Sequence, residues 1–229
     1  FDVLRNPRIK AVVIATPPNT HYLIASNALE WGKDVLVEKP MTLDLAEAKK
    51  LVTLAEKKKC ILMVGHLMMF HEGYLKLKQD LETAGKINYI QARRLEIKPG
   101  RKDVVWQLAP HDLSMIVDLL GEPKKTYCFG NDISAVLRLV YEGCGAGVFL
   151  SWAYPYEERT FSVICENKVL VFNNRLKIGK EPLMSEAEHF LECVKTRQKP
   201  ITSGADAIKI IKIINDARKS VLKDKELNV

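Results

Sequence analysis

Residues 11–21 read AVVIATPPNTH, an unbroken apolar run that ends in a turn rich in proline and threonine. An apolar run without alternation is typical of a parallel strand that is buried on both faces. The runs at 35–37 (VLV) and 61–64 (ILMV) have the same character, and helical patterns separate the three runs. This succession of strands and helices predicts a parallel α/β sheet with right-handed crossovers.

Signals for helix ends agree with this interpretation. Asn19 is the expected N-cap of the first helix, and Gly32 is its expected C′ residue. Asp44 and Glu47 predict a capping box at the start of the second helix.

The residues that follow the three predicted strands are polar or conformationally restricted: Thr16, Pro17, Pro18 and His21, then Glu38, Lys39 and Pro40, then His66. The carboxyl ends of parallel strands meet at one edge of the sheet, and ligands of open α/β sheets bind outside that edge. Taken singly, each residue has a plainer explanation, because prolines punctuate loops, lysines are solvated and histidines pack in cores. Their convergence on one edge predicts a ligand or cofactor site.

Beyond residue 67 the predicted strands and helices are segregated, as in an α+β domain. Strands are expected at 87–97, 135–141, 146–152, 160–166 and 169–172, and helices at 73–84, 106–120, 185–196 and 204–222. We therefore expect two domains, residues 1–67 and residues 68–229, with the C-terminal helix packing back on the first domain.

The motifs ATPPNTH at 15–21, EKP at 38–40 and GH at 65–66 resemble those of the Gfo/Idh/MocA oxidoreductases, the relatives of glucose–fructose oxidoreductase and inositol dehydrogenase. The similarity continues through residues 183–190 and the C-terminal helix. It implies an NAD(P)-binding Rossmann domain followed by an α+β domain with a large, open, mostly antiparallel sheet. It also implies hydride transfer between a nicotinamide and a sugar or cyclitol carbon.

By this resemblance, eight residues lie along an NAD or NADP cofactor: Thr16, Pro17, Pro18, His21, Glu38, Lys39, Pro40 and His66. Lys39 is also implied to reach the substrate hydroxyl. The family's opening strand, its Gly-x-Gly-x-x-Gly turn and the acidic residue after the next strand are not in this sequence. We expect about two strand–helix units, roughly 60–80 residues, to be missing. Such a chain is expected to bind nicotinamide weakly and to self-associate over its exposed sheet edge.

The stretch WQLAPHDLS at 106–114 resembles a branch of the family that acts on nucleotide sugars such as UDP-N-acetylglucosamine or its uronic acid. Members place a catalytic histidine on this helix, often four residues after an aspartate; His111 matches the histidine, and Gln107 stands where the aspartate would be. We expect His111 to act as general base beside Lys39, with Lys39 as the alternative base and a packed helix histidine as the plainer explanation of His111. The expected substrate-binding residues are Arg94, Arg101, Trp106, Gln107 and Arg159.

Composition narrows the class of partner. The net charge is +7, from 35 basic and 28 acidic residues, and it favours an anionic small molecule. The basic residues are scattered, which disfavours nucleic acid. Five cysteines without a CxxC motif predict a reducing, cytoplasmic location. The apolar runs are too short to span a membrane.

Two further expectations concern metals and assembly. His66, His71 and His111 lack the spacing of a zinc site, so we expect no metal. A homo-oligomer formed through the C-terminal sheet is expected. The alternative to an enzyme is a truncated, cofactor-free sugar-binding or regulatory protein, which the absent glycine-rich turn favours.

Overall fold

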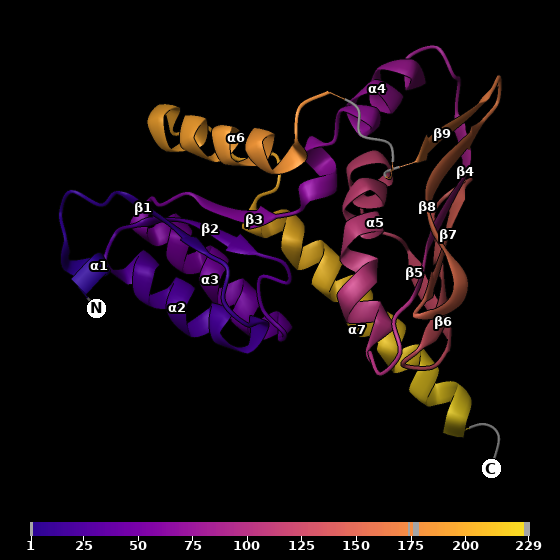
Figure 1. The fold of residues 1–229 in the computed structure, drawn as a ribbon, viewed down its shortest axis with the longest axis horizontal. Coiled ribbons are helices and arrows are strands. Elements are labelled where there is room, and N and C mark those ends of the chain that lie inside the picture. Colours follow the sequence, from indigo (N-terminus) through magenta and orange to yellow (C-terminus); the bar gives the residue numbers. More distant parts are fainter. Residues whose placement is uncertain (1, 174, 176–178, 227–229) are drawn as a thin grey trace.

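The computed structural model describes residues 2–173, 175 and 179–226. It contains one sheet of three strands and one sheet of six strands, which lie at opposite ends of the molecule (Figure 1). A short helix, α1 (Asp2–Arg5), precedes the first sheet.

The three-stranded sheet is parallel throughout, as the sequence predicts. Its strands are β1 (Ala11–Ile14), β2 (Asp34–Glu38) and β3 (Leu62–Gly65), in the order β1-β2-β3. Glu38 pairs with Gly65 at the carboxyl edge of the sheet. The turns that follow the strands are therefore neighbours in space.

Helices lie on both sides of this sheet (Figure 1). On one side are α2 (Pro18–Glu30) and α3 (Leu45–Lys58), and on the other is α6 (Pro182–Thr196). The predicted cap of α3 is confirmed, because the Asp44 side chain accepts a hydrogen bond from the Glu47 backbone N–H.

The predicted N-cap of α2 is wrong. The helix begins at Pro18, and its N-cap is Pro17, which offers no side-chain cap. Proline suits the first helical turn because it has no N–H to leave unpaired. Asn19 therefore lies inside the helix.

The six-stranded sheet is mixed and mostly antiparallel, with only β4 and β7 parallel to each other. Its spatial order is β5-β6-β7-β4-β8-β9. The strands are β4 (Ile87–Ile97), β5 (Lys125–Gly130), β6 (Ser134–Val140), β7 (Gly145–Ser151), β8 (Ala153–Cys165) and β9 (Val169–Asn173).

The sequence prediction missed β5 and placed the start of β8 at residue 160 rather than Ala153. Of the β5 residues only Cys128 is buried, and apolar Tyr127 and Phe129 flank it on the exposed face. The strand therefore lacks the alternation that reveals a half-buried strand.

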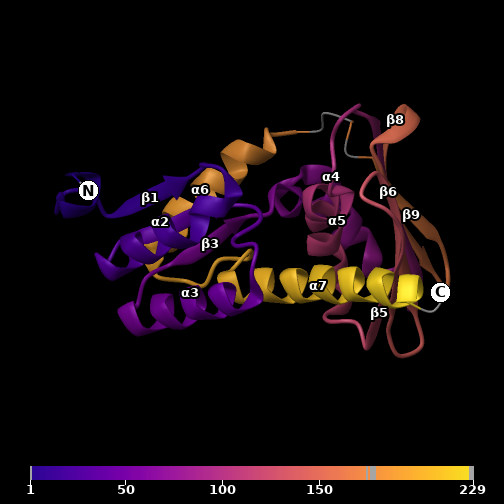
Figure 2. The ribbon, with the colours of Figure 1, turned by 90° about the horizontal axis from the view of Figure 1, so that it is seen from below.

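The inner face of the six-stranded sheet is covered by α5 (Val104–Leu120), α4 (Glu72–Leu81) and the far part of α7 (Gly204–Glu226) (Figures 1 and 2). The long helix α7 packs on α3 and β3 near its start and on α5 and β5 further along, so it runs from one sheet to the other. A single-turn helix, η1 (Leu67–Phe70), joins β3 to α4.

Two surfaces of these sheets stay open within the described part of the chain. The outer face of the six-stranded sheet has no helix over it (Figure 2). Strand β1 pairs only with β2, and Val13 on it is 66% exposed. None of the described helices is long and apolar enough to cross a membrane.

Candidate functional site

A cavity of about 840 Å³ lies between the carboxyl edge of the three-stranded sheet and the inner face of the six-stranded sheet. The edge contributes the start of α2 and the turn after β2, and the large sheet contributes β4 and β8. Helix α5 forms the wall between them. Nine residues of the predicted site line this cavity: Pro18, Lys39, Pro40, Arg94, Arg101, Trp106, Gln107, His111 and Arg159.

Lys39 extends from the end of β2 to the first turns of α5. Its Nζ donates a hydrogen bond to the backbone carbonyl of Gln107 over 3.0 Å. Burial lowers the pKa of Lys39 to about 8; Glu38 opposes this shift, and the positive charge of Arg94 adds to it. About a tenth of the amine is therefore neutral at pH 7, far more than for an ordinary lysine, and a neutral amine is a competent base.

His111 faces the same cavity from α5, but its electrostatic surroundings differ. Burial lowers the pKa of His111 well below its ordinary value, and the charges of Arg94 and Lys39 lower it further. The ring is therefore neutral at neutral pH. Such a ring donates one hydrogen bond and accepts another, and it is a weaker base than Lys39.

Asp112, next to His111 in sequence, does not serve as its acid partner. It forms a bidentate salt bridge with Arg94, whose Nε and Nη2 donate hydrogen bonds to the carboxylate over 2.8 and 3.0 Å. Both side chains are almost completely buried. Arg94, predicted to grip phosphate, thus has its charge balanced within the protein.

The remaining wall of the cavity is strongly cationic. Among its described residues six are basic and two are acidic: Lys39, Arg94, Lys98, Arg101, Arg159 and Arg218 against Glu96 and Asp103. Glu96 is shared by Arg159 and Lys98, at 2.8 and 2.5 Å. Exposed Arg101 donates to the Gln107 side chain over 3.2 Å. Arg94 is balanced by Asp112, and Arg159 also pairs with Glu157 at 2.9 Å. The smaller surplus of positive charge that remains attracts an anion.

The other predicted residues lie outside the cavity lining. The His21 ring bridges two turns, with one nitrogen 2.8 Å from the Pro40 carbonyl oxygen and the other 2.8 Å from that of Thr16. The Thr16 hydroxyl lies 2.7 Å from that of Thr20. His21 and Thr16 thus hold the α2 turn against the Lys39–Pro40 turn.

Glu38, Pro17 and His66 also lie apart from the cavity lining. Glu38 accepts a hydrogen bond from the backbone N–H of Lys39 over 3.1 Å. A side chain at position 65 would meet its carboxylate at 3.1 Å, which accounts for Gly65. His66 is buried, and it lines a separate small cavity that α5 also borders.

Sequence reasoning missed Glu96, Lys98 and Trp152 in the cavity wall. Glu96 had a signal, because it is two residues from Arg94 on β4, a spacing that favours the same face of a sheet. Lys98 follows the end of β4. Trp152 follows β7 and carried no comparable signal. Within the described ranges, no cluster of three or more metal-binding side chains is present.

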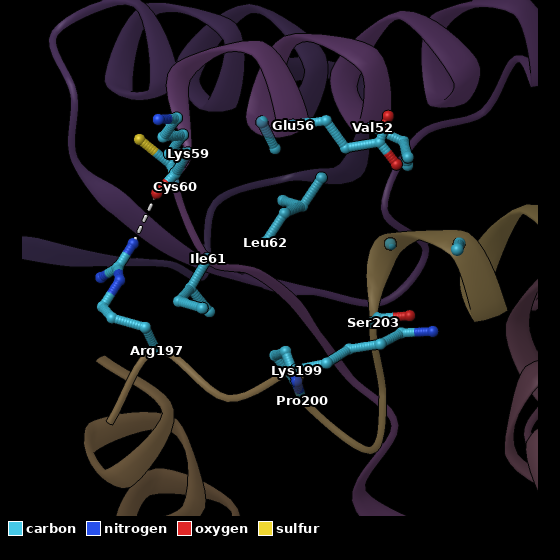
Figure 3. A pocket seen from close by; sticks show the side chains of 13 residues that line it. Val52, Glu56, Lys59, Cys60, Ile61, Leu62, Arg197, Lys199, Pro200 and Ser203 are labelled. Atoms are coloured by element: carbon cyan, nitrogen blue, oxygen red, sulfur yellow. Dashed lines mark hydrogen bonds between the residues drawn. The ribbon is translucent and has the colours of Figure 1, made fainter. Parts of the chain in front are cut away.

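A second hollow, of about 620 Å³, lies between α3, β3 and the segment leading into α7 (Figure 3). It contains none of the predicted site residues. Of its basic residues, Arg197 is already bound to the Lys59 carbonyl oxygen and, at 2.6 Å, to the Asp34 carboxylate. The cavity that holds Lys39 and His111 is therefore the better candidate.

Comparisons with known proteins identify the family. Residues 2–66 match a family model described as an oxidoreductase family with an NAD-binding Rossmann fold. The chain is 38% identical to scyllo-inositol 2-dehydrogenase (NAD(+)) of Bacillus subtilis (strain 168), over 90% of this chain and 74% of that protein. It is 36% identical to UDP-N-acetylglucosamine 3-dehydrogenase of Acidithiobacillus ferrooxidans, over 49% of this chain and 36% of that protein.

Solved structures extend the similarity to the whole fold. The structure of the Acidithiobacillus ferrooxidans UDP-N-acetylglucosamine 3-dehydrogenase superposes with a TM-score of 0.83 at 25% identity, over 93% of this chain and 78% of that one. A probable dehydrogenase from Thermotoga maritima reaches 0.88 at 19% identity, over 97% of this chain and 82% of that one, and shares the fold. In sequence, the chain spans little more than a third of several curated relatives, including 38% of Escherichia coli YhhX.

Proposed function

The chain belongs to the Gfo/Idh/MocA family of oxidoreductases, and we propose that it acts in NAD(P)-dependent hydride transfer at a hydroxyl carbon of an anionic sugar. The observation that carries this proposal is the meeting of Lys39 and His111 in one cationic cavity at the carboxyl edge of the parallel sheet. Ligands of such sheets bind outside this edge.

The residues at the sheet edge fit the nicotinamide end of a dinucleotide. Pro18, Lys39 and Pro40 border the cavity, and the His21 bridge fixes the two turns that carry them. A glycine-rich turn for the diphosphate is not among the three strand-ending turns described here. When bound, the nicotinamide supplies a hydride acceptor at its ring carbon.

We assign the proton to Lys39. An alcohol loses hydride readily only as its hydroxyl proton leaves, so the site needs a base near the oxygen. The pKa of about 8 makes Lys39 better matched to this task than His111, whose pKa lies well below its usual range. As a neutral amine, Lys39 keeps an N–H for the Gln107 carbonyl while its lone pair accepts the proton.

His111 then orients the reacting oxygen. Its neutral ring offers one N–H, which stabilises the negative charge that develops on that oxygen. We thus prefer the alternative that the sequence left open, Lys39 as base, to His111 as base. The reason is the burial of His111, which lowers its pKa, with the neighbouring charges of Arg94 and Lys39 adding to the shift.

The cationic wall supports a nucleotide sugar as the substrate. Arg101 and Arg159 border the cavity beyond Lys39, and a guanidinium grips phosphate oxygens in two places. A relative that is 36% identical over part of the chain carries the name UDP-N-acetylglucosamine 3-dehydrogenase. We propose UDP-N-acetylglucosamine or its uronic acid as the substrate class.

A second copy of the chain is the proposed partner of the open sheet face. The face exposes a group of large apolar side chains: Tyr127, Phe129, Val136, Val169 and Val171. Tyr127, Phe129 and Val136 lie on the neighbouring strands β5 and β6 at one edge of the sheet, and Val169 and Val171 lie on β9 at the opposite edge. Exposed apolar side chains that gather on a surface mark interaction sites. A homo-oligomer formed through this sheet would cover them.

The test is a panel of substrates. Wild-type protein with NAD or NADP is offered UDP-N-acetylglucosamine, its uronic acid and neutral inositol, and reduced nicotinamide is measured. We expect turnover with an anionic sugar and its loss in Lys39→Met. Binding of sugar without any reduction of the nucleotide would favour the cofactor-free alternative.

A further inference from the structure

Gln107, at the start of α5, contacts two cations of the proposed active site through two different oxygen atoms. Its backbone carbonyl accepts the hydrogen bond from Lys39 Nζ over 3.0 Å. Its side-chain Oε1 accepts a hydrogen bond from Arg101 Nη1 over 3.2 Å. Both acceptors are neutral, so neither contact cancels the charge of the cation that it holds.

The other cations of the cavity wall have carboxylate partners. Four of the described lining residues have a carboxylate oxygen at 3.8 Å or less from a side-chain nitrogen: Arg94, Lys98, Arg159 and Arg218. Neither Arg101 nor Lys39 forms a salt bridge with any residue that the structure describes. Since Lys39 acts as a neutral base, Arg101 carries the positive charge that is left for an anionic substrate.

A tight turn fixes the backbone of Arg101. Residues 98–101 form a β-turn, which the Arg101 N–H closes by donating to the Lys98 carbonyl oxygen over 3.3 Å. Gly100 has a φ of 79° and follows Pro99, a combination that is typical of a type II turn. The Lys98 N–H donates to the Trp152 carbonyl oxygen over 2.8 Å, so the turn is tied to the segment after β7.

The amide of Gln107 fixes the side chain of Arg101. While Oε1 accepts from Arg101, Nε2 donates to the Lys102 carbonyl oxygen over 2.8 Å. These two contacts need one acceptor and one donor, which a carboxamide has and an ionised carboxylate lacks. A carboxylate at position 107 would also pair with Arg101 and cancel its charge. A neutral amide thus holds the guanidinium in place and leaves it positive.

We infer that Gln107 is a positioning residue that makes the site selective for anionic substrates. It holds Arg101 at a set place relative to Lys39, so that the anionic group binds the guanidinium while the reacting hydroxyl lies at the amine. The inference rests on the proposed function, because it assigns the substrate choice of that same site. The anion it selects presents two oxygens to the guanidinium, as a diphosphate or a sugar carboxylate does.

The physical basis of this role is preorganisation. A free arginine side chain loses rotational freedom when it binds an anion, and this loss weakens binding. The turn and the amide restrict Arg101 before the substrate arrives. Lys39 is held by the backbone of Gln107 and not by its side chain. A change of the Gln107 side chain is therefore expected to weaken anion binding and to leave the chemical step unchanged.

The first test measures binding without turnover, by calorimetry with UDP and with uridine, which has no phosphate. Gln107→Met removes both amide contacts and is expected to weaken UDP binding roughly 3- to 10-fold, the usual effect of one hydrogen bond. Gln107→Glu places a carboxylate beside Arg101 and is expected to weaken it roughly 10- to 100-fold. Uridine is expected to bind wild type and both variants equally.

A matched control and a second ligand complete this test. Gln79→Glu adds the same charge at an exposed position of α4 outside the cavity lining, and it is expected to keep wild-type affinity for UDP. D-glucuronate is titrated in the same way. A loss of affinity for glucuronate in place of UDP would assign the sugar carboxylate, instead of the diphosphate, as the group that Arg101 holds.

The second test separates positioning from general damage to the fold. With UDP-N-acetylglucosamine, Gln107→Met is expected to raise KM roughly 3- to 10-fold and to leave kcat unchanged, and with neutral inositol it is expected to change neither constant. In the Arg101→Gln background, Gln107→Met is expected to change KM no further, because the amide then has no guanidinium to hold. Methionine and glutamate are good helix formers, so both variants are expected to fold.

The outcomes distinguish the role of Gln107 from the proposed function. An equal loss of affinity for UDP and uridine, or the same rise of KM with and without Arg101, would overturn the role of Gln107 alone. Wild-type affinity for both UDP and glucuronate in Gln107→Glu would do the same. If one variant does not fold, the other is used for the same comparisons. A wild type that binds UDP in this Gln107-dependent way but transfers no hydride would overturn the proposed function and support the anion site.

Discussion

Lys39 and His111 line the same cavity, and both side chains are largely withdrawn from water. Burial lowers the pKa of both groups, because both carry positive charge when protonated. An ordinary lysine has the higher pKa, so the pKa of Lys39 is still about 8 after this shift. The pKa of His111 falls below the range in which a base is useful at neutral pH. The choice of Lys39 as the base depends on this difference in pKa.

The pH dependence of turnover follows from Lys39. A base must be deprotonated to act, so oxidation of the sugar is expected to rise with pH and to level off above about 8. The arginine of Lys39→Arg stays protonated at all accessible pH values. This variant is expected to show no rise of turnover with pH, and its turnover is expected to be roughly 10²–10⁴-fold lower. Initial rates of nicotinamide reduction, measured across pH, give both the pH profile and the loss of turnover. A profile that keeps its limb in Lys39→Arg would assign the base to another group.

Arg101 is expected to affect the KM of anionic substrates more than that of neutral ones. It is one of the exposed cations of the cavity wall and donates to the Gln107 side chain. Loss of a hydrogen bond from a charged group is expected to raise KM for a nucleotide sugar by roughly 10- to 100-fold in Arg101→Gln, with little change for inositol. Steady-state kinetics on both substrates measure this, with Arg8→Gln as a surface control. An equal change for both substrates would exclude a phosphate contact.

At the scale of elements, helix α6 carries a buried carboxyl that faces a second one. Glu186 is 2% exposed, and its Oε1 has no partner among the described residues. Burial raises the pKa of Glu186 to about 7, and the charge of Glu38 adds to the shift. The folded protein thus holds a proton on Glu186 that the unfolded chain, with a pKa near 4.3, releases earlier.

The sign of the resulting pH effect is opposite to that of a salt-bridged acid. Between about pH 4 and pH 7 the folded state binds more protons, so its stability falls as pH rises through this window. Glu186→Gln removes the cost of ionising a buried carboxyl. The free energy of unfolding of this variant is therefore expected to be roughly 3 kcal/mol higher than that of the wild type above about pH 8, and little changed at about pH 5. Urea unfolding at both pH values measures it. A gain of equal size at both pH values would point to packing instead.

Elements also show what the sequence predicted and what it did not. The three parallel strands and the edge that carries Lys39 were predicted, because unbroken apolar runs and the turns after them are local signals. Strand β5 was missed, since Cys128 is its only buried residue. The pairing of Arg94 with Asp112 and the shared Glu96 join distant segments. Their geometry depends on β4 lying beside α5 and β8, which no local pattern specifies.

At the scale of the whole molecule, the open sheet face sets the expected assembly. Phe129, on the edge strand β5, is 56% exposed on this face. Phe129→Asp would place a charge in the proposed interface, where burial without a partner is costly. We expect this variant to sediment as a smaller species than wild type. Val3→Asp, at an equally exposed position on α1, is the control, and equal sedimentation of both variants and the wild type would contradict the interface.

The central claim is that this cavity passes a hydride from a sugar carbon to a nicotinamide with Lys39 taking the proton. The most direct measurement follows deuterium from the reacting carbon of a labelled UDP-N-acetylglucosamine into the nicotinamide, by mass spectrometry at saturating NAD. We expect deuterium in the reduced nicotinamide with wild-type protein and none with Lys39→Met. Sugar bound in the cavity without any transfer of deuterium would contradict it.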